Sequence, residues 1–462
     1  MTPRRRILRT AARTLLAAAL SAPAAVAGQK APDIPFEKFT LPNGLEVILH
    51  VDRSTPIVAV NSWYKVGSGD EKPGRTGFAH LFEHVMFMGS EHVPVGKFDE
   101  WLEAAGANNN GSTSFERTNY YETGPSNALP LMLWLGADRM GWLLPTMDLA
   151  KLDLQRDVVK NERRQSVDNA PYGRSFETIL AALFPSSHPY SWPVIGSLTD
   201  LSAASVDDVK EFFRKYYAPN NASIAIAGDF NPDSAKVWVR KYFGTVPRNP
   251  DAPVRATLPA RTSRKDTVLV QEDRVQLPRA YYAWHGVKGF HADEPALDAL
   301  VAILAGGKSS RLYRTLVYEK QIAQDVSMSD QASKLDGVIL LSATAKPGVH
   351  PSAIAAEFDA AIRRVVDDGV TERELTRQKN GIRAGVLDEI STVLGKADRL
   401  NYYNYFVGTP DYLKQDLERY DRVTLADVQR VARQYLVAQP KVVMTVVPEG
   451  KQELALKAGG AN

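Results

Sequence analysis

The chain has 462 residues, of which 44% are hydrophobic and 24% are charged, and it contains no cysteine. This length predicts two or three domains, and the composition is that of a globular protein, which excludes a disordered or fibrous chain. Without cysteine the chain can form neither a disulfide nor a lipidated N-terminal cysteine, so we expect its stability to come from hydrophobic cores.

The first 27 residues have the pattern of a cleavable signal peptide. A basic start and a short apolar run are followed by the small-residue ending Ala25-Val26-Ala27. The alternative is a lone anchor helix, but the apolar run is too short to span a bilayer. We expect a periplasmic or secreted protein with no stable membrane anchor after processing.

Cleavage of this segment changes the charge balance. The whole chain has a formal net charge of +3, and residues 1–27 carry five arginines and no acidic residue, so residues 28–462 carry −2. A near-neutral chain has no broad electrostatic footprint for nucleic acid or anionic lipid. We therefore expect no nucleic-acid partner.

Two strands and a helix are predicted next. Residues 45–52 and 57–67 alternate apolar and polar side chains, which indicates two half-buried strands. The segment 67–77, rich in glycine and charged residues, leads from them into a helical run that begins near Phe78. This helix carries the strongest chemical signal in the chain.

The signal is the pattern His80-Leu81-Phe82-Glu83-His84. His80 and His84 are four residues apart, so both imidazoles leave the same face of one helix and can share a metal ion. Glu83 can hold a carboxylate beside that metal and take the proton of a bound water. This is the inverted zinc-peptidase order, and two histidines that merely cap a polar helix face would not explain it.

A third ligand must come from elsewhere in the chain, since catalytic zinc commonly has three protein ligands. Residues 149–170 predict a charged amphipathic helix with few acids. Spacing alone does not choose between Glu162 and Asp157, and a solvated surface carboxylate is the ordinary role of either.

Two sequence motifs resemble the pitrilysin/insulinase-type zinc metallopeptidases, in their bacterial two-lobed, processing-peptidase-like branch. They are GFAHLFEHVMFMGS (77–90) and VVKNERRQ (158–165). The resemblance implies that Glu162 is the third Zn²⁺ ligand. Members of that family often carry an acid seven residues earlier as outer-shell support, where this chain has Gln155, and a neutral amide there can still donate a hydrogen bond.

Between these motifs, residues 106–124 resemble the family stretch in which the edge of a sheet receives extended substrate. The resemblance implies substrate-binding roles for Asn110, Thr113 and Tyr120. An open edge offers unpaired backbone groups to any extended peptide and largely ignores its side chains. For Asn110 alone, a simple turn that leads into a core strand is an equal alternative.

The two halves of the chain end alike. Residues 206–229 and 425–448 each predict an amphipathic helix, a turn and a β-rich run, with Asp208 and Tyr216 in the positions of Asp427 and Tyr435. We read an α+β protein of two homologous lobes, each a mostly antiparallel sheet packed with helices. The predicted lobes are residues 28–250 and 265–462, joined by a polar linker, 251–264.

The second lobe departs from the resemblance at one motif. In the family that the chain resembles, the second lobe usually presents an Arg and a Tyr that bind the substrate carbonyl. The matching stretch of this chain, 316–324, has Val317 and Gln324 at those two positions. Arg314 and Tyr318 lie nearby but are shifted along the predicted helix. The resemblance thus implies a zinc-bearing subunit that forms a heterodimer with a paralogous, Arg/Tyr-bearing chain.

Three functions are consistent with these residues. The first is a zinc-dependent endopeptidase subunit that hydrolyses unfolded peptides, with Glu83 as general base. The second is a non-catalytic peptide-binding or assembly subunit of the same fold, which the missing pair favours and the intact Glu83 opposes. A zinc hydrolase for a non-peptide substrate is the third, because ligands alone do not fix the substrate.

Overall fold

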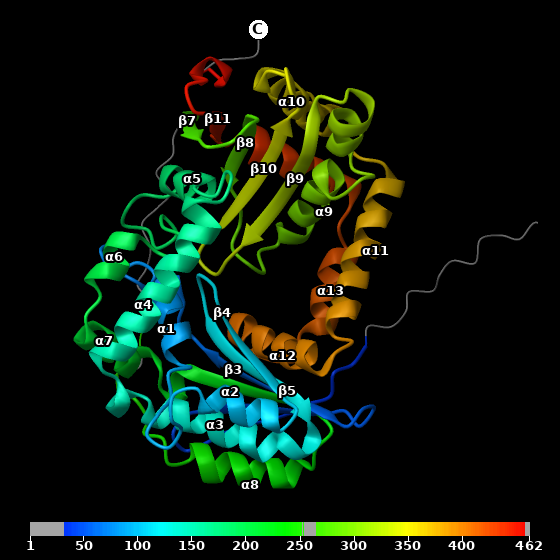
Figure 1. Ribbon diagram of the computed structural model, residues 1–462. Helices are drawn as coiled ribbons and strands as arrows, with labels where there is room; N and C mark the ends of the chain where they lie inside the picture. Colours follow the sequence, from blue (N-terminus) through cyan, green and yellow to red (C-terminus); the bar gives the residue numbers. More distant parts are fainter. Residues whose placement is uncertain (1–31, 252, 254–264, 458–462) are drawn as a thin grey trace, which may run out of the picture.

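The computed structural model describes residues 32–251, 253 and 265–457. It contains two β-sheets, one built from strands before residue 251 and one from strands after residue 265, each packed with helices (Figure 1). The predicted signal peptide, 1–27, and all of the predicted linker except residues 251 and 253 lie outside the described residues. None of the described helices is long and apolar enough to cross a membrane.

The first sheet has six strands in the order β1-β2-β6-β3-β5-β4. Neighbouring strands are antiparallel except β2 and β6, which are parallel. Strand β4 ends the sheet and is paired on one side only. The strands are β1 (Glu37–Thr40), β2 (Glu46–Val51), β3 (Ile57–Tyr64), β4 (Asn108–Thr113), β5 (Thr118–Pro125) and β6 (Ala222–Gly228).

The second sheet has five strands in the order β7-β11-β8-β10-β9. Only β7 and β11 are parallel. The strands are β7 (Thr267–Asp273), β8 (Arg279–His285), β9 (Ala323–Ala332), β10 (Gly337–Ala345) and β11 (Val442–Pro448).

The two sheets share one topology, which supports the predicted homology of the lobes. The order β2-β6-β3-β5-β4 maps strand for strand onto β7-β11-β8-β10-β9, and the parallel pair falls in the same place. The helices that precede β6 and β11 also begin alike, because Ser205 with Asp208 and Thr424 with Asp427 each form a capping box. The predicted α+β class with mostly antiparallel sheets is confirmed.

Eight α-helices accompany the first sheet in sequence and six accompany the second among the described residues. The first group is α1 (Phe78–Val85), α2 (Lys97–Ala104), α3 (Leu129–Trp142), α4 (Leu149–Arg163), α5 (Ser175–Leu183), α6 (Leu198–Ala203), α7 (Val206–Tyr216) and α8 (Pro232–Phe243). The second group is α9 (Glu294–Ala305), α10 (Pro351–Asp368), α11 (Glu372–Glu389), α12 (Val393–Val407), α13 (Leu413–Asp421) and α14 (Leu425–Val431). The π-helical segments η4 (Arg164–Asp168) and η7 (Ala432–Val437) continue α4 and α14, and a third, η6 (Tyr313–Glu319), lies between α9 and β9.

Each half of the chain has one helix that packs on the sheet of the other half. Helix α12 packs on β3 and β6, where Ala397 and Leu400 join Ile48 and Ala225 in one buried cluster (Figure 1). Helix α5 packs on β8 and β11, where its apolar side joins a cluster with Tyr281 and other residues of the second sheet. The division by chain position stays a prediction, but the packing crosses it, so we expect the two lobes to depend on each other for stability.

Candidate metal centre and peptide-binding edge

Helix α1 separates an apolar face from a metal-binding face. Its residues Phe78, Ala79, Leu81, Phe82 and Val85 are buried in the core of the first lobe. Helical geometry places His80, Glu83 and His84 on the remaining surface, since residues three and four apart are neighbours there. Burial of one face therefore fixes the direction in which the other face presents its side chains.

The start of α1 is held in place by a buried carboxylate. Glu71 accepts hydrogen bonds from the backbone N–H groups of Gly77 and Ala79, at 3.0 and 2.8 Å, and from the indole of Trp192. Burial raises the pKa of Glu71, although the three donors act in the opposite direction. Gly77 has φ +85°, and a Cβ there would lie 2.7 Å from the Ile195 carbonyl oxygen, so this turn requires glycine.

Glu162 approaches the two histidines from the last turn of α4. Its Oε2 lies 3.3 Å from His84 Nε2 and 3.7 Å from His80 Nε2. The side chains are 12% exposed for His80, 24% for His84 and 44% for Glu162, so the cluster is half-buried and open on one side. One ligand atom from each of the three residues lies within 4.8 Å of the other two.

This cluster fits a divalent metal ion. Burial lowers the pKa of His80 to about 4, so its ring is neutral at pH 7 and can offer a lone pair. The adjacent His84, chiefly by hydrogen bonding, lowers the pKa of Glu162, which keeps that carboxylate ionised. Two imidazoles and one carboxylate are a known catalytic zinc set. Asp157, the alternative third ligand, is absent from every metal-compatible group among the described residues.

Glu83 connects the metal cluster to strand β4. Its Oε2 accepts a hydrogen bond from the hydroxyl of Thr113, with an O···O distance of 2.6 Å. Burial raises the pKa of Glu83, while the Thr113 hydroxyl and the charge of His84 lower it. A Cβ on Gly111 would lie 3.0 Å from Glu83 Cγ, so the strand passes directly beside the carboxylate.

The free edge of β4 has a backbone donor that does not pair with another strand. The N–H of Gly111 donates to the side-chain Oδ1 of Asn110 at 2.8 Å, and therefore points away from β5 toward the open edge. In an antiparallel ladder such outward groups recur at every second residue, so Asn109 and Thr113 share this edge with Gly111. Asn110 is exposed and satisfies the donor only locally, which leaves the edge able to pair with an extended peptide.

Tyr120, for which a substrate-binding role was predicted, lies in the core of the first lobe and not on the open edge of the sheet. Its side chain is fully buried, and its hydroxyl bonds to the Phe82 carbonyl oxygen and the Tyr217 hydroxyl. On β5 the side chains alternate between the core of the first lobe and the opposite face, and Tyr120 lies on the core side. Its hydrogen bond to the Phe82 carbonyl oxygen connects β5 to α1.

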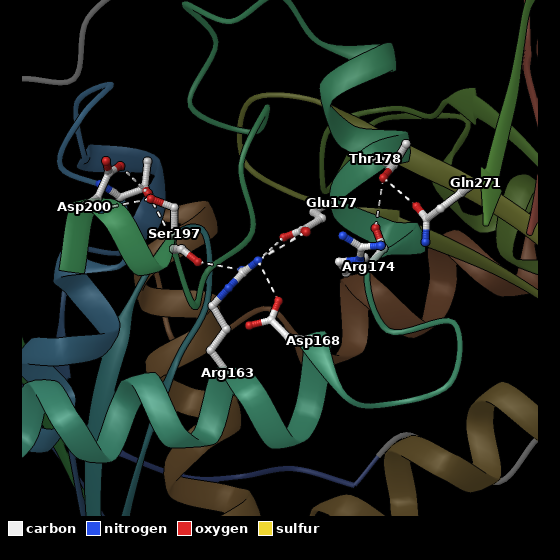
Figure 2. Close-up of polar contacts among 10 residues, drawn as sticks. Arg163, Asp168, Arg174, Glu177, Thr178, Ser197, Asp200 and Gln271 are labelled. Atoms are coloured by element: carbon white, nitrogen blue, oxygen red, sulfur yellow. Dashed lines mark hydrogen bonds and ion pairs between the residues drawn. The ribbon is translucent and has the colours of Figure 1, made fainter. Parts of the chain in front are cut away.

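Arg163, the neighbour of Glu162, connects α4 to the start of α1. This buried side chain donates to the Gly196 carbonyl oxygen at 2.7 Å and to the carboxylates of Glu177 and Asp168, as Figure 2 shows. Gly196 packs so closely on Gly77 that a Cβ on Gly196 would lie 2.3 Å from the Gly77 nitrogen. Glu162 is thereby held at a fixed position relative to the helix that carries His80 and His84.

The same network reaches the second lobe. Glu177 and Thr178 both belong to α5, and the Thr178 hydroxyl donates to Gln271 of β7 at 2.9 Å (Figure 2). The start of α1 is also held by Asp200, whose carboxylate accepts hydrogen bonds from both the N–H and the hydroxyl of Thr76. Sequence reasoning missed Glu71 and Arg163, although the position of Arg163 directly after a predicted ligand was a usable signal.

Within the part of the chain that the structure describes, the remaining predicted positions form no side-chain hydrogen bond or ion pair with His80, His84 or Glu162. Val317 packs against the second core and Gln324 is exposed on β9. Among the described residues, neither Arg314 nor Tyr318 has a side-chain hydrogen bond or ion pair with the cluster, and Tyr318 is 76% exposed. Gln155 donates to the sulfur of Met88 at 2.7 Å, so its amide bonds to Met88 and not to a metal-binding residue.

Two family models match this chain. The model described as Insulinase (Peptidase family M16) matches residues 46–192, which include the metal cluster. The model described as Peptidase M16 inactive domain matches residues 203–382, which include most of the second sheet. Together they cover most of both lobes.

Relatives and solved structures agree with these matches. The chain is 30% identical over 406 residues to the zinc protease PqqE of Helicobacter pylori. The matched region covers 86% of this chain and 90% of that protein. It is 24% identical over 431 residues to the probable mitochondrial-processing peptidase subunit beta of Arabidopsis thaliana. That match covers 88% of this chain and 78% of the plant protein. The crystal structure of a protease from Helicobacter pylori superposes with a TM-score of 0.84 at 27% identity and covers 90% of this chain and 99% of that one.

Proposed function

This chain belongs to the insulinase-type peptidase family M16, and on that basis we propose that it is a zinc-dependent endopeptidase subunit that cleaves unfolded peptides. The observation that carries the proposal is the convergence of His80, His84 and Glu162, with the Glu83 carboxylate beside them. A purely structural metal site has no use for a carboxylate next to it.

In this account His80, His84 and Glu162 hold the zinc ion. Bound there, zinc supplies Lewis acidity, which lowers the pKa of a bound water and polarises the scissile carbonyl. Glu83 takes the proton of the attacking water and returns it to the departing amine. Its burial supports this role, because a raised pKa brings a carboxylate closer to the range in which it can both accept and donate a proton.

The substrate lies along the edge of β4 as an added strand. Backbone hydrogen bonds to Gly111 and its outward-facing neighbours hold an extended peptide, and Asn110 gives up its bond to the Gly111 N–H when the peptide arrives. A folded protein cannot present such a segment, which is why we assign unfolded peptides as the substrate class. Because Thr113 lies on this strand and bonds to Glu83, the docked backbone comes to rest beside the general base.

The chain also needs a partner in this proposal. Val317 and Gln324 replace the Arg and Tyr that the resemblance implies for the second lobe, so a paralogous chain that carries this pair supplies the donors for the substrate carbonyl. The name of the plant relative, a subunit beta, supports a divided enzyme. We place this heterodimer in the periplasm or outside the cell, after removal of residues 1–27.

A second candidate is a peptide-binding or assembly subunit without activity. The absent Arg/Tyr pair and the match of residues 203–382 to an inactive-domain model favour it. Both candidates bind extended peptide at β4, but only the first hydrolyses it.

The test compares cleavage of an unfolded-peptide mixture by zinc-loaded residues 28–462, alone and with an Arg/Tyr-bearing paralogue. Faster cleavage in the mixture supports the divided endopeptidase. Peptide binding without cleavage in either sample supports the second candidate, and a rate for the isolated chain that the paralogue does not raise contradicts the partner.

A further inference from the structure

A cavity of about 490 Å³ opens between the first sheet and the second half of the chain. One wall comes from β3, β4, β5 and the turn between β4 and β5, and it includes Ser112, Arg117 and Tyr121. The opposite wall comes from the end of α11 and the start of α12 and includes Asp388 and Asp398. The cavity therefore exists only because α12 packs on the sheet of the other lobe.

The cavity adjoins the edge on which the proposed substrate docks. Ser112 lies between Gly111 and Thr113, the two residues of β4 that touch Glu83. Successive side chains of a strand point to opposite faces, so Gly111 and Thr113 face the metal cluster while Ser112 faces the cavity. In an added strand, the residue opposite Ser112 shares its face, and its side chain points toward the cavity.

The charges that line the cavity favour a cation. Three carboxylates, those of Asp388, Glu389 and Asp398, line it against the single guanidinium of Arg117. Glu389 forms an ion pair with Arg399. Asp388 is exposed and has no side-chain partner among the described residues, so its charge is available to a ligand.

Asp398 also has a free oxygen. Asn61, Trp63 and Asn119 all donate to its Oδ1, at 2.8, 3.1 and 3.3 Å, and no described residue donates to Oδ2. Arg117 does not fill the cavity, because its Nη1 donates to the backbone oxygen and hydroxyl of Ser112, and its guanidinium stacks 5.2 Å from the centre of the Trp63 ring. The hydrogen-bonded Asp398 thus presents one oriented acceptor.

We propose that this cavity is a specificity subsite for a lysine or arginine side chain of the substrate. The inference rests on the proposed function, since it requires a peptide on β4. Tyr121 and Leu394 offer surface to the aliphatic stem of such a side chain, and Asp388 and Asp398 pair with its charged end. The enzyme would therefore cleave basic segments of unfolded chains in preference to neutral ones.

The experiment measures kcat/KM for a peptide series in which each position in turn is lysine or its uncharged isostere norleucine. The zinc-loaded chain is used, with the paralogue present where cleavage needs it. We expect one position to favour lysine by about tenfold. Asp388→Asn should reduce that preference to about twofold, whereas Asp368→Asn, at an exposed acid of α10 outside the cavity, should leave it unchanged.

Binding of the same series to the Glu83→Gln variant provides a second measurement that needs no turnover, and the same position should favour lysine. Cleavage with equal rates for lysine and norleucine at every position overturns the subsite and leaves the proposed function intact. A lysine preference that Asp388→Asn does not change also overturns the subsite. Failure to cleave or bind any peptide overturns the proposed function, and the subsite falls with it.

Discussion

The hydroxyl of Thr113 donates a hydrogen bond to the carboxylate of Glu83 with an O···O distance of 2.6 Å, although one residue lies on an edge strand and the other on a helix. This contact joins the surface that receives an extended peptide to the carboxylate that we assign as general base. A peptide that pairs with β4 is thereby aligned with Glu83 without contacts to its own side chains. The subsite beside Ser112 would add selectivity to this alignment.

Thr113→Val should lower kcat by about tenfold and leave KM nearly unchanged, because the hydrogen bond that orients the Glu83 carboxylate is lost while the backbone edge remains. Thr113→Ser retains the hydroxyl and should keep most of the activity. Steady-state kinetics on one unfolded peptide measures both variants. Full activity in Thr113→Val would contradict the role of the hydrogen bond.

Metal binding should depend on all three converging residues. His84→Ala and Glu162→Gln should each reduce bound zinc from one ion per chain to about none after dialysis, measured by elemental analysis. Zinc added at about 100 times its Kd should stabilise the wild-type apoprotein by about 2.7 kcal/mol. Asp157→Asn, at the rejected alternative ligand, should keep one zinc. Its loss in that variant would reopen the assignment of the third ligand.

Arg163 should act on the metal through the position of Glu162. Arg163→Ala removes the bonds to Gly196 and Glu177, and we expect zinc affinity to fall by about 10- to 100-fold, as for other outer contacts of metal ligands. Arg163→Lys should recover part of the affinity. The neighbouring Arg164→Ala is the matched control, because among the described residues the Arg164 side chain donates only to the exposed Asn161. Competition with a chelator measures the zinc affinity, and equal affinities in the two alanine variants would contradict the role of Arg163.

Stability should fall with rising pH because of Asp330 on β9. Burial, reinforced by Asp298 and Glu294, raises the pKa of Asp330 from 3.8 to about 8, and neither of its oxygens has a hydrogen-bond partner among the described residues. Between these two pKa values the folded state keeps a proton that the unfolded state has released, so each pH unit costs up to about 1.4 kcal/mol of stability.

Asp330→Asn removes this titration. Its free energy of unfolding, relative to wild type, should therefore increase from pH 5 to pH 8 in urea titrations. The exposed Asp368→Asn should show no such trend. A stability difference between Asp330→Asn and wild type that stays constant over this range would contradict the raised pKa.

Local pattern was enough for the elements that carry the chemistry. The apolar positions of α1 determine which face the core takes, so His80, Glu83 and His84 remained for the other face before any tertiary contact was known. The match of Asp208 to Asp427 likewise predicted similar helices in the two halves, and in the structure both residues complete a capping box. These features depend on residues that are close together in the chain.

Features that depend on distant residues could not be predicted. The resemblance implied a substrate-binding role for Tyr120, and the alternation of β5 could not test it, because alternation predicts two faces but does not tell which one is buried. Asp398 reaches Asn61 across 337 positions only because α12 covers the sheet of the other lobe. No periodicity indicates such an exchange, so the cavity beside Ser112 was not visible in the sequence.

The most direct test compares peptide hydrolysis by wild type and Glu83→Gln at equal zinc content, under whichever condition, alone or with the paralogue, the wild type cleaves. The substitution keeps the size of the side chain and spares all three metal ligands. We predict one zinc per chain in both proteins and a loss of at least about 1000-fold in kcat for Glu83→Gln. Undiminished cleavage by the zinc-loaded variant would contradict the assignment of Glu83 and, with it, the catalytic centre described above.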